Sequence, residues 1–113
     1  MIQQVTRTAW ITVIGQQENT DVVPRTIDIL GRRYKIRRKK MKDYGYVDDD
    51  LQIIWLKSGI KGDVACKTVM HEVIHAILFS SGSKFQMTAE QEESIVRALE
   101  HGIWQAGYRL VSE

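Results

Sequence analysis

The chain has 113 residues, a length typical of one domain, and carries a net charge of only +2 at pH 7. Its residues are 43% hydrophobic and 27% charged, near the average for globular proteins, and only 1 Pro and 8 Gly exclude a disordered or collagen-like chain. No apolar run approaches the roughly 20 residues that a membrane span needs. A single cysteine, Cys66, excludes an internal disulfide, and no signal-like segment opens the chain, so we expect a cytoplasmic protein whose residues 1–113 form one domain.

The first two thirds of the chain have the composition of β-strands. Ala9–Ile14 is a short run of β-favouring residues. Thr26–Leu30 and Tyr34–Arg38 lie on either side of Gly31-Arg32-Arg33, and this spacing predicts a hairpin. A run of three aspartates then predicts a turn before Leu51–Leu56, which has the apolar character of a buried strand.

The last third of the chain shows two helical patterns. Val64–Ser80 lacks Gly and Pro and is apolar on most sides, which predicts a central buried helix with Asp63 as N-cap and Gly82 just after its end. A capping box at Thr88 begins a second helix that should end near Ala106. Its apolar stripe comprises Ile95, Val96, Leu99 and Ile103. Strands followed by helices predict an α+β fold, with both helices packed on an antiparallel or mixed sheet of three to four strands.

The central helix contains His71-Glu72-Val73-Ile74-His75, an H-E-x-x-H motif. Histidines at positions i and i+4 project from one helix face, so both imidazoles can bind the same zinc ion. Glu72 points away from direct coordination but can reach a metal-bound water, where a general base is needed. Polar side chains on such an apolar helix are costly to bury without a partner, so the motif predicts a Zn²⁺ site. The alternative is two hydrogen-bonded core histidines beside a solvated glutamate.

A catalytic zinc site needs a third protein ligand besides water. The third histidine of an H-E-x-x-H-x-x-G-x-x-H motif is absent, because that position is Ser81. The candidates are acidic residues of the second helix: Glu90, Glu92, Glu93 and Glu100. Helical-wheel geometry places Glu92 nearest the middle of the apolar stripe and Glu93 at its margin, and it allows either residue. His101 lies opposite the stripe and is expected at the surface.

Three segments carry a resemblance to a known family. They are residues 44–56 (YGYVDDDLQIIWL), 67–78 (KTVMHEVIHAIL) and 92–99 (EESIVRAL). Together they resemble the small phage and bacterial zinc metallopeptidases, which have a minimal gluzincin-type domain related in plan to the SprT-like and ImmA/IrrE-like groups. The similarity covers about residues 26–107 and implies a zincin-like fold.

The resemblance also implies a ligand set. By analogy the zinc ligands are His71, His75 and Glu93, and Glu72 is the catalytic base. In this family the ligand glutamate precedes a Val-x-x-Leu pattern by three residues, and residues 96–99 (VRAL) supply that pattern. The resemblance therefore favours Glu93 over Glu92.

The implied activity is zinc-dependent hydrolysis of peptide bonds in a protein or peptide substrate. Zinc activates a water and polarises the scissile carbonyl, while Glu72 transfers a proton to the leaving amine. Such enzymes pair extended substrate with an edge strand beside the active-site helix, and Leu51–Leu56 is the candidate strand. Tyr44 and Tyr46 are candidates for stabilising the oxyanion, with a packed or turn position as the alternative for both.

A basic segment supports a second hypothesis. Of the 11 residues Arg32–Lys42, 8 are Lys or Arg. These charges fit a solvated strand edge, with Tyr34 and Ile36 packed on the other face, or a site for an anionic partner such as DNA. The alternative function is thus a nucleic-acid-binding module with a structural zinc or an inactive zincin scaffold. No membrane partner is expected.

Overall fold

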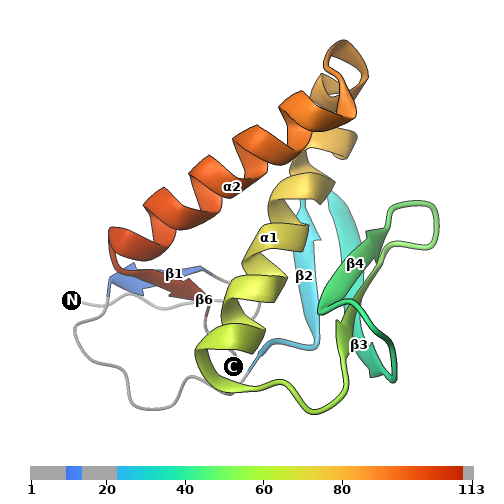
Figure 1. Cartoon of the computed structure of the whole chain (residues 1–113). Coiled ribbons are helices and arrows are strands. Elements are labelled where there is room, and N and C mark those ends of the chain that lie inside the picture. The colour runs from blue at the N-terminus through green and yellow to red at the C-terminus, as the bar shows by residue number, and fades with distance from the viewer. Residues whose placement is uncertain (1–9, 14–22, 111–113) are drawn as a thin grey trace.

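A computed structural model describes residues 10–13 and 23–110 of the protein (Figure 1). The described elements follow the order β1 (Trp10–Val13), β2 (Thr26–Ile29), β3 (Arg32–Lys39), β4 (Gly45–Asp48), β5 (Ile53–Lys57), α1 (Gly62–Ser80), η1 (Ser83–Gln86, a 3-10 helix), α2 (Ala89–Gln105) and β6 (Tyr108–Leu110). The α+β class predicted from the sequence is confirmed. β1 lies within the predicted strand Ala9–Ile14, whose two end residues are outside the described ranges.

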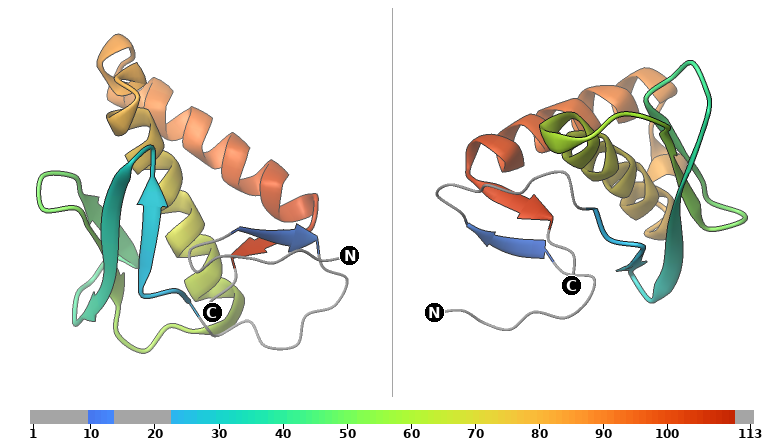
Figure 2. Two further views of the ribbon diagram at one scale, coloured as in Figure 1. Left: turned by 180° about the vertical axis from the view of Figure 1, so that it is seen from behind. Right: turned by 90° about the horizontal axis from the view of Figure 1, so that it is seen from below.

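Four strands form a mixed sheet in the order β2-β3-β5-β4. β3 and β5 run parallel, and the other neighbouring strands run antiparallel. β5 therefore lies inside the sheet, and the prediction that Leu51–Leu56 is an edge strand is wrong. Ile54 and Leu56 of β5 are fully buried, as expected for a strand with a partner on each side, whereas the short strand β4 takes the outer position. β1 and β6 form a separate antiparallel pair near the end of α2 (Figure 2).

The hairpin between β2 and β3 turns one residue earlier than predicted. Leu30 and Gly31 have positive φ angles of 47° and 84°, as in the two-residue turns that suit strand twist, and Ile29 pairs with Arg32. Arg32 and Arg33 consequently belong to β3 and not to the turn. β3 lies inside the strand order, but Arg32–Lys35 pair with β2 and Lys35–Lys39 pair with β5, so among the described strands the basic second half of β3 is paired on one side only. One face of β3 is solvated, as the sequence predicted.

α1 covers one face of the sheet (Figure 1). The core between them consists of fully or almost fully buried side chains: Ile27, Ile29, Tyr34, Ile54, Leu56, Cys66, Val69 and Val73.

α1 begins at Gly62 with Lys61 as N-cap, so the prediction that Asp63 is the N-cap is wrong. Asp63 lies in the first turn, where a carboxylate interacts favourably with the helix dipole. Gly82 follows the C-terminus in the left-handed conformation, as predicted. Among the described helices, none is long and apolar enough to cross a membrane.

α2 packs against α1 and β6, and α1 lies between it and the sheet (Figure 1). The prediction that both helices lie on the sheet is therefore wrong for α2. The predicted capping box is present, with Thr88 and Gln91 as its two members. Val96 is fully buried, whereas Ile95 and Leu99 of the predicted stripe are 38% and 45% exposed, because only one side of α2 has a partner among the described elements.

Gly45 at the start of β4 provides a test of this packing. A Cβ atom at Gly45 would lie 2.7 Å from Cγ2 of Thr68 in α1 and 2.8 Å from the carbonyl oxygen of Trp55 in β5. Because the second contact is with backbone inside the sheet, we expect Gly45→Ala to lower the free energy of unfolding by about 1–3 kcal/mol in urea denaturation. The matched control is Gly102→Ala in α2, where an added Cβ meets nothing within 4 Å. This substitution should raise the free energy of unfolding by up to about 1 kcal/mol, because Ala favours a helix more than Gly does. Equal urea midpoints for Gly45→Ala and wild type would contradict the described packing.

Candidate metal centre

The two histidines of the H-E-x-x-H motif lie on the side of α1 that faces α2. His71 and His75 are one helical turn apart, and their ring centroids are 4.9 Å from each other. Both side chains are partly buried. The opposite side of α1 packs into the sheet through Val69 and Val73, so the rotation of the helix is determined and both imidazoles are directed toward α2.

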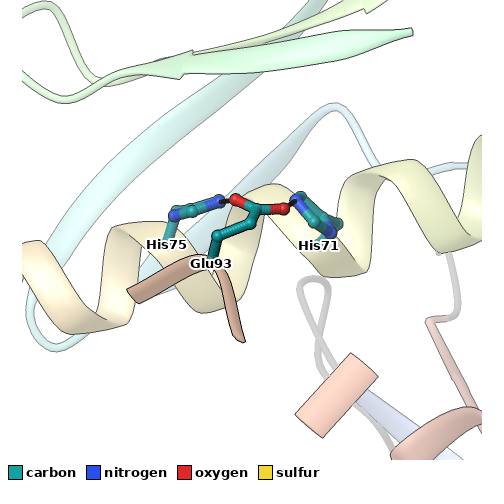
Figure 3. Close-up of side chains that lie close together, drawn as sticks. All are labelled: His71, His75 and Glu93. Carbon is teal, nitrogen blue, oxygen red and sulfur yellow. Dashed lines mark ion pairs between the residues drawn. The ribbon is translucent and has the colours of Figure 1, made fainter. Parts of the chain in front are cut away.

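Glu93 of α2 lies between the two imidazoles (Figure 3). Its Oε2 is 3.3 Å from Nε2 of His71, and its Oε1 is 3.2 Å from Nε2 of His75. One possible ligand atom from each of the three residues lies within 4.8 Å of the others, so the group can hold a metal ion. Two imidazole nitrogens and one carboxylate are a donor set that transition metals accept.

The other nitrogen of each imidazole contacts a second carboxylate. Nδ1 of His71 is 2.9 Å from Oε1 of Glu100, and Nδ1 of His75 is 2.6 Å from Oε2 of Glu92. An ionised carboxylate only accepts hydrogen bonds, so Nδ1 of each histidine must donate its proton. Nε2, the nitrogen beside Glu93, is then the atom of each ring that could coordinate a metal ion, which is the arrangement that metal-binding histidines use.

Of the four glutamates considered for the third ligand, the helical wheel left Glu92 and Glu93 open, and the structure brings both to the site in different positions. The Glu93 carboxylate lies beside the Nε2 atoms, whereas the Glu92 carboxylate contacts Nδ1 on the other side of the His75 ring. Glu100 takes the same supporting position for His71. Glu90 and His101 are exposed and lie outside the group, the latter as predicted.

Glu72 is buried at the edge of the same pocket. Burial is the main cause that raises the pKa of Glu72 to about 7, and the neighbouring carboxylates of Glu93, Asp49 and Glu100 act in the same direction. A carboxyl group that titrates near neutrality can both accept and release a proton there. Glu72 is not one of the three residues that can share a metal ion, as expected from its position in the motif.

The site opens into a pocket of about 590 Å³ between α1, α2 and the start of β4. Tyr44 and Gly45 line it from the strand side, and Arg97 lines it from α2, where its guanidinium lies 3.1 Å from Glu93. Of the two tyrosines considered for the oxyanion, only Tyr44 lines this pocket. Tyr46 does not: its hydroxyl lies 2.8 Å from Nζ of Lys39.

Comparisons with known proteins do not add to this picture. No family model matches the chain, and no curated protein or solved structure matches it either. The relation to zinc metallopeptidases therefore stays a prediction.

Metal titration can separate the roles of Glu92 and Glu93. We expect Glu93→Ala to weaken Zn²⁺ binding more than about 100-fold, because it removes a ligand. Glu92→Gln should weaken binding by about 10- to 100-fold, because it only removes support for His75. Competition with a chromophoric chelator measures the affinity of wild type and of each variant, with Glu90→Gln as the exposed control that leaves binding unchanged. Equal losses in Glu92→Gln and Glu93→Ala, or no binding by wild type, would contradict this assignment.

Proposed function

We propose that the protein is a zinc-dependent metallopeptidase in which His71, His75 and Glu93 bind Zn²⁺ and Glu72 acts as general base. The observation that carries the proposal is the convergence of two Nε2 atoms and one carboxylate beside a buried carboxyl group at an open pocket. Three protein ligands leave one position of a tetrahedral zinc ion for water or substrate, as catalytic zinc sites require.

The residues of the chain have separable tasks in this reaction. A bound zinc ion supplies activation of water and polarisation of the scissile carbonyl. Glu72 accepts a proton from the attacking water at its carboxylate and gives it to the amide nitrogen as the C–N bond breaks. Glu92 and Glu100 hold the imidazoles in one orientation and one tautomer through Nδ1.

The substrate of the proposed enzyme is an extended segment of a protein or peptide. β4 is the outer strand of the described sheet on the side of the pocket, and Gly45 at its start lines the pocket. An extended chain can add to such an edge through backbone hydrogen bonds, which makes β4, and not β5, the strand for substrate pairing. Tyr44, on the same side of the pocket, is the candidate to stabilise the oxyanion.

Replacing Glu72 tests this mechanism. Glu72→Gln keeps the shape of the side chain but cannot accept the proton, so we expect it to lower peptide hydrolysis by about 100-fold or more while one zinc per chain is retained. The measurements are elemental analysis of metal content and cleavage of a fluorogenic peptide library by zinc-loaded protein. Chelation should abolish wild-type cleavage, and added Zn²⁺ should restore it.

The exposed residue Glu90 supplies the matched control, because Glu90→Gln makes the same chemical change away from the metal group. It should cleave like wild type. Cleavage by Glu72→Gln at the wild-type rate, or no cleavage by zinc-loaded wild type, would overturn the proposal.

A further inference from the structure

The face of the four-stranded sheet that points away from α1, which we call the outer face, carries cations and aromatic rings in adjacent rows. Strand pairing places Arg37, Trp55 and Tyr46 next to one another on β3, β5 and β4. Side chains two residues away on a strand share the same face, which adds Lys35 and Lys39 on β3. No described helix covers this face (Figures 1 and 2).

The cations on the outer face are available to a partner. Lys35 and Arg37 are exposed, and within the described ranges neither has an ion pair, whereas neighbouring Arg33 is paired with Asp28 at 2.8 Å. Asp48 of β4 is the acidic residue that strand pairing places on the outer face of β3, β5 and β4. Its carboxylate accepts a hydrogen bond from the backbone N–H of Leu51. The outer face of these three strands is therefore strongly positive.

Aromatic rings lie among these cations. Nζ of Lys39 is 4.4 Å from the ring centroid of Trp55 and 5.1 Å from that of Tyr46. Tyr46 is 40% exposed, although its neighbours on the opposite face of the sheet are covered by α1. Lys39 also donates a hydrogen bond to the Tyr46 hydroxyl at 2.8 Å. An exposed cation–π contact contributes only about 0.5–1 kcal/mol, so a more strongly stacking ligand can displace the lysine from the rings.

We propose that the outer face binds single-stranded nucleic acid. Phosphates would contact Lys35, Arg37 and Lys39, and bases would stack on Trp55 and Tyr46. Alternate residues of a strand are roughly 6.6 Å apart, a spacing comparable to that of successive phosphates in an extended single strand. Base stacking on aromatic residues together with a cationic track is the common mode of single-strand binding.

Other anionic partners fit this face less well. An acidic peptide would use the cations but gains little from the rings. A DNA duplex buries its base planes, and the broad sheet offers no helix to enter the major groove. The proposal does not depend on the metal centre, which lies on the other side of α1 from the sheet core.

Fluorescence anisotropy of the full chain with a labelled oligothymidylate of about 20 nucleotides tests this inference at about 50 mM salt. We expect Lys35→Gln/Arg37→Gln to weaken binding at least about tenfold and to reduce the slope of log K against log salt by roughly 1.4, because two phosphate contacts are lost. The matched control is Lys61→Gln/Lys84→Gln, which removes the same charge near the two ends of α1 and should change binding less than about twofold.

Trp55 provides the test of stacking. Trp55→Leu should weaken binding at least about fivefold, and Trp55→Phe should retain most of it, because a phenyl ring still stacks on a base. Circular dichroism and a thermal melt verify that both variants are folded. Glu72→Gln should bind the oligonucleotide like wild type, so loss of peptidase activity and loss of this binding are separate results.

Three results would overturn the inference. The first is no binding of the oligonucleotide by wild type at low salt. The second is equal weakening by the two double variants, which would indicate only an effect of net charge. The third is a combined result: poly-glutamate or duplex DNA binds more tightly than the single strand, and folded Trp55→Leu binds the oligothymidylate as tightly as wild type does.

Discussion

The contact between α1 and α2 is the constraint on which the site depends. Met70 and Ile74 of α1 and Val96 of α2 form a buried cluster next to the histidines. Val96 follows Glu93 by three residues and precedes Glu100 by four, so these three residues occupy neighbouring positions along one side of α2. One buried apolar contact therefore places the carboxylates of the site opposite α1.

The charge around the histidines is the second constraint, and it supports a cation at the centre. Glu92, Glu93 and Glu100 contact the imidazole pair, and Glu72 lines the same pocket. Arg97 pairs with Glu93, but it is 74% exposed, and such surface pairs contribute little. Burial is the main cause of the raised pKa of Glu72, and repulsion from the nearby carboxylates of Glu93 and Glu100 raises it further. A divalent cation between the Nε2 atoms and Glu93 would offset this repulsion directly.

Successive side chains of β3 point to opposite faces of the sheet, so the basic residues of this strand fall into two groups. Arg32 points inward, where its guanidinium donates hydrogen bonds to the Tyr34 hydroxyl, the Ser80 hydroxyl and the Asp49 carbonyl. Lys35 and Arg37 point outward on the same strand. Part of the positive charge thus connects β3 to α1 and the turn after β4, and the remainder is left on a surface that faces solvent.

The sequence by itself determined the features that depend on near neighbours along the chain. The i, i+4 spacing put His71 and His75 on one face, the capping box began α2 at Thr88, and the apolar pattern predicted a buried α1. Only the tertiary structure decided the order of β4 and β5 and the distinct positions of Glu92 and Glu93. A helical wheel gives the angle of a residue on its own helix, whereas the rotation of that helix against another is determined by contacts between distant residues such as Val96 and Met70. Strand order likewise depends on which strand can be buried on both sides, and that is decided by the assembled sheet.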